Sequence, residues 1–388
     1  MNTDNLSALA VGVGVVALIA GFGVYFNNPD LNKAASGQQK NFVPAAIIEN
    51  GTVTEVQIDK SQFKLAPELA QISGYINTDL VTLADLRGKV VLIDFWTYSC
   101  INCIRTIPYL NAWYEKYADD GLVIVGVHTP EFEFEKDYDN VKAAVEKFGI
   151  KYPVAQDNDK GTWKAYENRY WPRKYLVDNE GYIRYDHIGE GSYAETEKVI
   201  QSLLLERAAY MGITNTTTPL DQSISNPKNA QSVNFGRIDT PELYFGYQFA
   251  RAPLGNPEGF RPDQTVKYTI PEDTTTILPN RIYLDGGWKN NADHMELQSE
   301  TGRVVLSYSA KAVNIVAGGS SGSVLYISED GSSLTGSSSR GADVSEDGTI
   351  AIDGQKLYNL AMHENYGKHQ LVINVKGKGF EIYTFTFG

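Results

Sequence analysis

Cysteine is nearly absent from this chain of 388 residues, which contains only two. A disulfide-stapled framework needs several cysteine pairs spread along the sequence, so that class of fold is excluded. A structural zinc site needs a second pair of ligands at comparable spacing. The five histidines are scattered, and none forms an HxH or HxxxH pair. We therefore expect no metal site.

The chain also lacks a basic excess, with 34 Lys and Arg against 47 Asp and Glu and a net charge of −13. Nucleic-acid binding depends on clustered Lys and Arg side chains, and no such cluster is present. We therefore expect no nucleic-acid partner. The 42% apolar content excludes disorder for the whole chain, and the length suits two domains.

Only one long apolar run is present, the uncharged segment 6–26. As a helix it would rise about 1.5 Å per residue and cross a hydrocarbon core of roughly 30 Å. A cleavable signal peptide has a shorter apolar stretch with basic residues before it, whereas MNTDN has none. We predict an uncleaved membrane anchor at 1–27, followed by a tether at 28–70 that contains one strand at 52–58.

Residues 71–208 have an α/β pattern. Continuous apolar runs predict strands buried on both faces, and apolar residues at helical spacing predict helices between them. The expected strands are 89–95 and 122–127, with a hairpin of 175–177 and 183–187, and the expected helices are 100–117, 141–148 and 194–208. Such an alternation predicts a mixed sheet with helices on its faces.

The composition changes twice beyond this region. Residues 209–236 are rich in Asn, Thr, Ser and Pro and are interpreted as a linker. Residues 237–388 contain short alternating segments separated by Gly, Ser, Asn and Asp, which is typical of an all-β sandwich. The expected strands are 266–270, 281–284, 304–308, 313–316, 324–327, 371–375 and 380–387.

The two cysteines, Cys100 and Cys103, lie three residues apart at the start of the helix that follows strand 89–95. A thiol there lies at the positive end of the helix dipole, which stabilises its thiolate. Cys100 is therefore the expected nucleophile, and Cys103 is the resolving thiol of a dithiol exchange. Asp94, inside the apolar strand, is the expected proton acceptor.

These motifs resemble a known family. The stretch Val81–Arg105 (VTLADLRGKVVLIDFWTYSCINCIR) resembles thioredoxin-fold domains of the TlpA/ResA type. More narrowly, FWTYSCINC, GVHTPEFEFEK (126–136) and YWPRKYLVD (170–178) resemble the extracytoplasmic part of the DipZ family of cytochrome c biogenesis proteins. The resemblance extends from about Leu65 to the C-terminus.

The resemblance implies a thioredoxin fold in which Asp94 is the buried carboxyl and Pro172 is the cis-proline beside the cysteines. It also implies that the backbone of Trp171 pairs with an extended client. Trp96 and Tyr98 are expected to shape the rim of the site.

Two further residues, His128 and Glu131, end the second strand and could add a titratable group near the cysteines. The plain alternative is that both are ordinary loop residues.

DipZ proteins carry a polytopic electron-importing domain, whereas this chain has one predicted span. The resemblance therefore implies a separate membrane electron donor similar to CcdA or the DsbD core. It also implies an extracytoplasmic location on the cell membrane and client proteins such as apocytochrome c. No cofactor is expected besides the Cys100–Cys103 disulfide.

The β-domain of the family resembles carbohydrate-binding modules with a jelly-roll sandwich. Trp288, in the segment GGWKNN, is the aromatic residue most expected to be exposed and to stack on a cell-envelope glycan. A docking surface, or a cap over the redox domain, would serve equally well.

The function predicted from these observations is a membrane-anchored thiol:disulfide oxidoreductase that reduces client disulfides. One alternative is a peroxiredoxin-like peroxidase: Thr97 and Cys100 satisfy half of the PxxxTxxC motif, but Ile93 occupies the proline position. Another is a glycan- or protein-binding module with a vestigial CxxC. The dipeptide Ile101-Asn102 leaves the direction of electron flow open.

Overall fold

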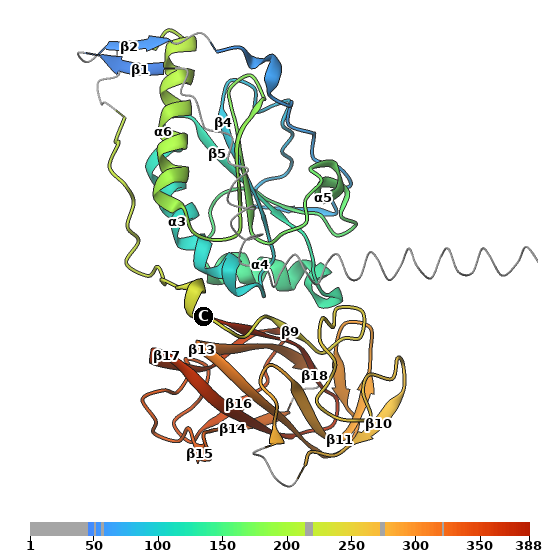
Figure 1. The fold of residues 1–388 in the computed structure, drawn as a ribbon. Coiled ribbons are helices and arrows are strands. Elements are labelled where there is room, and N and C mark those ends of the chain that lie inside the picture. The colour runs from blue at the N-terminus through green and yellow to red at the C-terminus, as the bar shows by residue number, and fades with distance from the viewer. Residues whose placement is uncertain (1–45, 50–51, 56–57, 214–219, 272–275, 320–321) are drawn as a thin grey trace, which may run out of the picture. The chain divides into compact units, whose positions relative to one another are not determined.

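The computed structural model describes residues 46–49, 52–55, 58–213, 220–271, 276–319 and 322–388 (Figure 1). The predicted anchor at 6–26 lies outside these residues. Within the described part, no helix has both the length and the apolar character needed to span a membrane. Internal contacts divide the chain into two compact units: residues up to Trp96 with 106–129 and 149–228, and residues 97–105 with 130–148 and 229–388.

A six-stranded sheet forms the centre of the first unit (Figure 1). Its order is β3-β6-β5-β4-β7-β8, in which β4, β5 and β6 run parallel and the remaining neighbours pair antiparallel. The strands are β3 (Gly74–Ile76), β4 (Val90–Trp96), β5 (Leu122–His128), β6 (Val154–Gln156), β7 (Arg173–Val177) and β8 (Ile183–Ile188).

Every residue of β4 is buried, which explains its uninterrupted apolar sequence apart from Asp94. Such a strand is covered on both faces, as expected for the middle of an α/β sheet. The helices are α3 (Ile101–Tyr117), α4 (Tyr138–Lys147), α5 (Gly161–Ala165) and α6 (Tyr193–Tyr210), with short 3-10 helices η1 (Lys60–Gln62), η2 (Glu133–Lys136) and η3 (Phe235–Arg237). This arrangement confirms the predicted thioredoxin-like fold.

Some elements differ from the sequence predictions. The single strand expected at 52–58 is β2 (Thr52–Glu55), which pairs with β1 (Ala46–Glu49) as an antiparallel hairpin. The short strands β3 and β6 and the helix α5 were not predicted. Their few residues are too short for a periodic pattern to emerge.

The C-terminal part is all-β, as predicted, and forms one ten-stranded hydrogen-bonded sheet. Its main path is β10-β11-β12-β18-β13-β17-β14-β15, with β9 on β18, β16 on β14 and a further β11–β13 pairing. The strands are β9 (Leu243–Tyr244), β10 (Thr265–Tyr268), β11 (Ile282–Asn290), β12 (Met295–Leu297), β13 (Thr301–Gly319), β14 (Val324–Glu329), β15 (Ser332–Ser333), β16 (Thr349–Ala351), β17 (Lys356–Lys376) and β18 (Phe380–Phe387).

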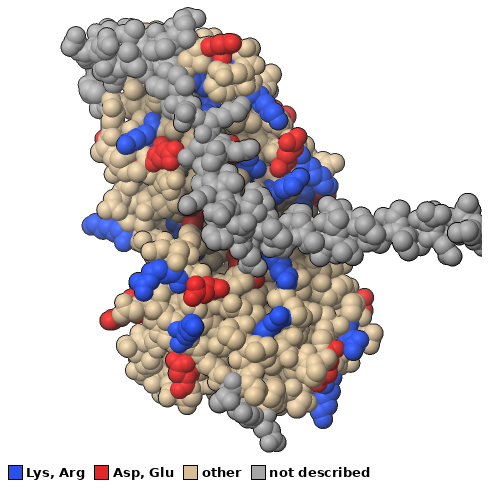
Figure 2. Space-filling model, viewed as in Figure 1, with Lys and Arg blue, Asp and Glu red and all other residues tan. Residues whose placement is uncertain are grey.

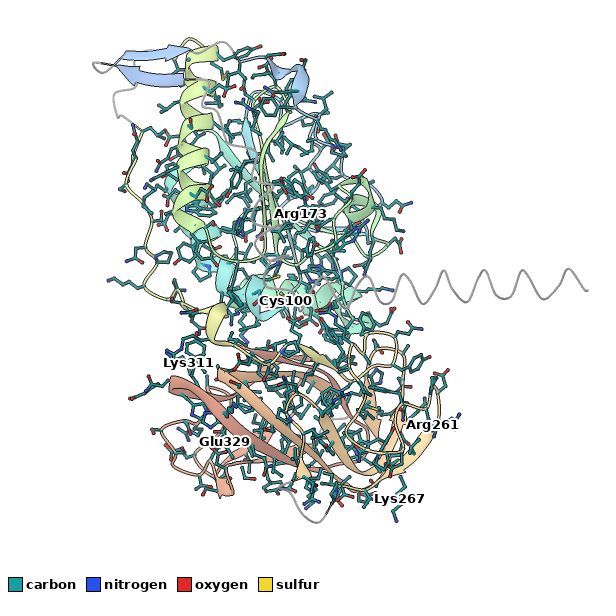
Figure 3. The ribbon with its side chains drawn as sticks, viewed as in Figure 1. Cys100, Arg173, Arg261, Lys267, Lys311 and Glu329 are labelled. Atoms are coloured by element: carbon teal, nitrogen blue, oxygen red, sulfur yellow. The ribbon has the colours of Figure 1, made fainter. Side chains whose placement is uncertain are left out.

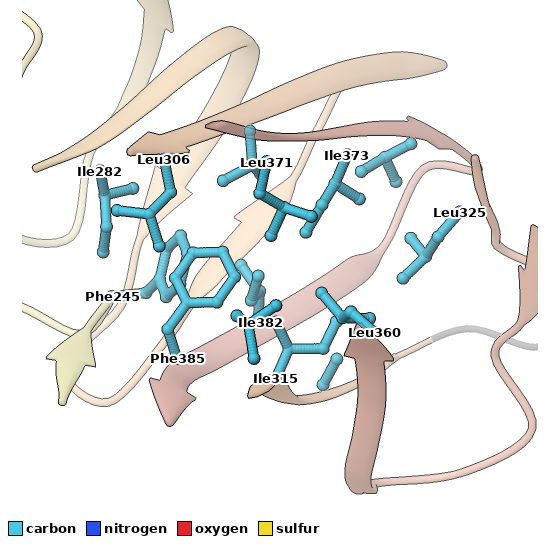
Figure 4. Close-up of a cluster of buried hydrophobic side chains, with 14 of the residues drawn as sticks. Phe245, Ile282, Leu306, Ile315, Leu325, Leu360, Leu371, Ile373, Ile382 and Phe385 are labelled. Carbon is cyan, nitrogen blue, oxygen red and sulfur yellow. The ribbon is translucent and has the colours of Figure 1, made fainter. Parts of the chain in front are cut away.

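Buried aliphatic and aromatic side chains from these strands form a large hydrophobic core, beside a smaller cluster of Ile270, Ile277, Tyr283 and Val305. Figure 4 shows Phe245 and Phe385 against Ile282, Leu306 and Ile382 at one end of this cluster. On the face drawn in Figure 2, acidic and basic side chains are interspersed among other residues.

Two predicted strands, 304–308 and 313–316, are one continuous strand, β13. The strand expected at 371–375 is only the end of β17, which begins at Lys356. The middle of β17 contains the polar stretch MHENYGKHQ, which lacks the alternation that predicts a strand.

The position of Trp288 differs from the prediction made from the sequence. This residue was expected to be exposed and to stack on a glycan, but it is fully buried in β11. Its indole N–H donates to the carbonyl of Asp285 at 2.9 Å. A Cβ on Gly302 would lie 2.9 Å from the indole ring, so this glycine provides the space that the ring occupies. The side chain is therefore part of the core.

Candidate active site

The two cysteines lie where β4 is followed by α3, and Figure 3 labels Cys100 at this point. The carbonyl of Cys100 accepts from the N–H of Ile104 at 3.0 Å, the first hydrogen bond of the helix. The sulfur of Cys100 accepts from the backbone N–H of Cys103 at 3.3 Å. A side chain that bonds the N–H three residues ahead is a helix N-cap, so this sulfur occupies the position that favours an anion.

Exposure distinguishes the two thiols. Cys100 is partly exposed, whereas Cys103 is 1% exposed. A nucleophilic thiol needs access to its substrate, and a resolving thiol needs access only to its partner cysteine. The arrangement therefore suits Cys100 for attack on an external disulfide and Cys103 for attack on the sulfur of Cys100.

Asp94 lies in β4, six residues before Cys100, and is 2% exposed. Burial raises the pKa of its carboxyl to about 7, and the positive charge of Lys174 acts in the opposite direction. In a buried carboxyl the charged form is disfavoured, so the proton is held to a higher pH. Asp94 can therefore take up or release a proton near neutral pH.

Lys174 was not predicted from the sequence. It lies directly across from Asp94 in the antiparallel β4–β7 register and is fully buried. Its ammonium donates to the carbonyl of Gly189 at 3.0 Å. A lysine is rarely buried without a partner. The only signal in the sequence is that this lysine directly precedes the apolar residues YLV in the segment YWPRKYLVD.

The peptide bond between Trp171 and Pro172 is cis. This is the conformation that the family resemblance implied. The indole of Trp171 donates to the carbonyl of Thr129 at 2.9 Å, which links the loop before β7 to the end of β5. The predicted pairing of the Trp171 backbone with a client stays a prediction.

Glu135 is a second residue that sequence reasoning missed. It is fully buried and accepts from the hydroxyl of Ser99 at 2.5 Å. Its other carboxylate oxygen accepts from the N–H groups of Glu131 and Phe132 at 2.6 and 3.0 Å. Burial raises the pKa of Glu135, and these hydrogen bonds act in the opposite direction. Through Ser99 this carboxylate positions the residue next to Cys100.

His128 and Glu131 were suggested as nearby titratable groups. Burial lowers the pKa of His128 to about 3, so its imidazole is neutral at physiological pH. The pKa of Glu131 is raised to about 8 by desolvation and by the carboxylates of Glu242 and Glu135. Of the two, only Glu131 titrates near neutral pH.

Trp96 was predicted to shape the rim of the site, and this prediction is wrong. Trp96 is 1% exposed at the end of β4, with its ring against the imidazole of His128. A side chain in this position supports the strand and cannot reach a client. Tyr98 is 5% exposed, and its role in client binding stays a prediction.

The fold and the CxxC site define a thioredoxin-like thiol–disulfide oxidoreductase, and the chain belongs to this family. A family model described as "AhpC/TSA family" matches residues 63–186, and one described as "Thioredoxin like C-terminal domain" matches residues 240–388. Thiol-disulfide oxidoreductase YkuV of Bacillus subtilis is 31% identical over 36% of this chain and 94% of its own length.

A second relative matches most of this chain. Protein DipZ of Mycobacterium bovis is 34% identical over 83% of this chain. The match spans 43% of DipZ, so the chain corresponds to less than half the length of that relative. Among solved structures, a thioredoxin-like protein in the oxidised form is 32% identical over 38% of this chain and 98% of its own, with a TM-score of 0.35.

Proposed function

We propose that this oxidoreductase reduces disulfides of client proteins on the extracytoplasmic side of a membrane, in the manner of cytochrome c maturation proteins. The observation that carries the proposal is the N-cap position of the Cys100 sulfur, 3.3 Å from the N–H of Cys103. A thiolate held there is the attacking group that disulfide exchange requires.

In the proposed reaction the Cys100 thiolate attacks one sulfur of a client disulfide. The client S–S bond breaks, one client sulfur leaves as a thiolate, and a mixed disulfide forms. Cys103 then attacks the sulfur of Cys100 after its proton passes to Asp94, and the second client sulfur leaves. Two electrons have moved to the client, and Cys100 and Cys103 end as a disulfide.

A new catalytic cycle requires two electrons from outside the chain. We propose a membrane electron donor similar to CcdA or the DsbD core, and an anchor within residues 1–27 that holds the chain beside it. The match to DipZ supports this proposal because the chain corresponds to part of that larger protein. The predicted boundaries at residues 70, 208 and 236 belong to the same proposal.

The reduction potential of the Cys100–Cys103 disulfide tests the direction of electron flow. It can be measured by equilibrating the full chain in thiol redox buffers and alkylating the remaining thiols. A reductase is expected to have a potential near that of thioredoxin, about −270 mV. A potential near that of DsbA, about −120 mV, would identify an oxidant and contradict the proposal.

The peroxidase alternative is separated by one variant, Cys103→Ser. A peroxidase that needs only one reactive thiol would turn over peroxide with Cys100 alone when an external thiol is supplied. The reductase proposal expects no appreciable peroxide turnover by this variant. Appreciable turnover would reverse the ranking of the two functions.

A further inference from the structure

Two histidines and a carboxylate come together in the all-β part of the chain, and none of the three is assigned to disulfide exchange. Glu329 ends β14, and Figure 3 labels it. His363 and His369 both belong to β17. One potential ligand atom from each of these three residues lies within 4.8 Å of the others.

A bulge in β17 brings the two histidines together. Between the paired residues Ala310↔Gly367 and Ala312↔Met362, β13 has only Lys311, whereas β17 has residues 363–366. Residues six apart in a regular strand would be separated by roughly 20 Å. Here the two imidazole rings stack with centroids 3.9 Å apart and planes at 1°. Bulges of this kind re-aim side chains and are common beside functional sites.

The carboxylate of Glu329 is buried and fully engaged. One oxygen accepts from the hydroxyl of Tyr308 at 2.5 Å, and the other lies 3.0 Å from Nε2 of His363. The exposed fraction of Glu329 is 5%. At this distance Nε2 of His363 donates its proton to the carboxylate, and it also lies 3.3 Å from the hydroxyl of Tyr308. A metal ion bound between the two residues would take the place of that proton.

His369 is oriented by a second carboxylate. Its Nδ1 lies 2.9 Å from an oxygen of Asp330, whose other oxygen accepts from the N–H of Gln370 at 2.8 Å. An imidazole that donates its Nδ1 proton to a carboxylate keeps Nε2 as a lone-pair donor. Metal-binding histidines are usually held in this way.

A second cluster of carboxylates is neutralised by basic side chains and provides a comparison. Asp178, Glu180 and Glu206 also lie within reach of one another. Lys60 forms ion pairs with all three, and Arg184 bonds Asp178 and Glu206 at 3.1 and 2.9 Å. That cluster already has permanent cations between its carboxylates. The cluster at Glu329 is paired instead with imidazoles, which are metal ligands when neutral.

We propose that Glu329, His363 and His369 bind a divalent transition-metal ion of the Zn²⁺ type, with Asp330 as the positioning residue for His369. Imidazole with one carboxylate suits Zn²⁺ and its neighbours, whereas Ca²⁺ and Mg²⁺ favour oxygen ligands. Because imidazole lone pairs lie in the ring planes, binding opens the parallel stack. Three protein ligands leave a position for water or another ligand.

The test uses the full chain with Cys100→Ser and Cys103→Ser, so that thiolates do not compete for the metal. Titration calorimetry with ZnCl₂ is expected to show one ion per chain. His363→Gln or His369→Gln should weaken binding at least tenfold, and Asp330→Asn should weaken it about tenfold to a hundredfold. His294→Gln is the matched control, because His294 also pairs with a carboxylate, that of Asp293, at 2.7 Å.

Nuclear magnetic resonance of the five histidines keeps the test valid even if a variant misfolds. In the same background, Zn²⁺ is expected to shift the imidazole signals of His363 and His369 while those of His128, His187 and His294 stay in place. The proposal is overturned if ZnCl₂ does not bind saturably. It is also overturned if both glutamine variants keep full affinity, or if Ca²⁺ binds as tightly while these two signals do not move.

Discussion

Asp94 and Glu329 are both buried carboxylates within sheets, and their surroundings give them different chemistry. Among the described residues, one oxygen of Asp94 has no hydrogen-bond partner. The pKa of Asp94 is raised to about 7 by burial. Both oxygens of Glu329 are held, by Tyr308 and by His363.

The difference shows how the same functional group can serve two purposes. An incompletely satisfied carboxyl with a pKa near neutrality can exchange a proton. A carboxylate fixed between a hydroxyl and an imidazole keeps its position and its lone pairs, which suits a ligand. We therefore assign proton transfer to Asp94 and metal binding to the cluster at Glu329.

The largest expected effect concerns stability. The pKa of Asp94 is about 7 in the folded chain and about 4 when unfolded, so the folded state binds more protons between these values. Stability must then fall as the pH rises from about 4 to about 7, by roughly 4 kcal/mol. Asp94→Asn removes this dependence. The free energy of unfolding of the variant, relative to that of wild type, should therefore increase as the pH rises from about 4 to about 7.

Denaturant unfolding of both proteins at pH 4, 5.5 and 8 measures the effect. Asp186→Asn is the control, because Asp186 is a carboxylate on β8 whose side chain is 38% exposed and pairs with Arg173 at 2.7 Å. If the difference between Asp94→Asn and wild type stayed constant with pH, Asp94 would not be the group with the raised pKa.

The next effect concerns turnover. Asp94→Asn should slow the Cys103 step by roughly a hundredfold, the usual contribution of a positioned proton acceptor. In wild type the rate of this step should rise with pH through about 7, since the acceptor must be ionised. Single-turnover reduction of a disulfide peptide by the reduced chain, followed from pH 5.5 to 8.5, measures both. A variant that keeps the wild-type profile would rule out this role.

The smallest effect concerns the loop beside the cysteines. In Glu135→Gln an amide N–H₂ faces N–H or O–H groups that donate to the carboxylate in wild type, so at least one donor loses its acceptor. The free energy of unfolding should therefore fall by roughly 1–3 kcal/mol. Glu133→Gln is the matched control, because the side chain of Glu133 is 77% exposed and pairs only at the surface with Lys136. Its effect should stay within about 0.5 kcal/mol. Equal effects of the two substitutions on the free energy of unfolding would show that Glu135 does not have this structural role.

The redox site could be predicted because its chemistry is local in the sequence. Cys100 and Cys103 are one helical turn apart, and Asp94 is the one charge in an apolar strand. Lys174 and Glu135 could not be predicted, because each gains its role from strand pairing or from a loop that folds back. Nothing in a single sequence reports which residue lies across a strand.

The all-β part shows the same limit more strongly. Its strand character was predicted from alternation, but the polar middle of β17 has none. The bulge that joins His363 to His369 is a property of the β13–β17 register. The prediction that Trp288 is exposed was wrong for a related reason. Glycines around an aromatic residue suggest an exposed loop, whereas here the space left by Gly302 accommodates a buried ring.

The central claim is that Cys100 is the attacking thiol and Cys103 the resolving one. The most direct test is the rate of alkylation of each cysteine by iodoacetamide, read by mass spectrometry from pH 5 to 9 in the reduced full chain. We predict that Cys100 reacts first because it is partly exposed, and that the buried Cys103 reacts only slowly. Faster reaction of Cys103, or equal rates at both sulfurs, would contradict the account.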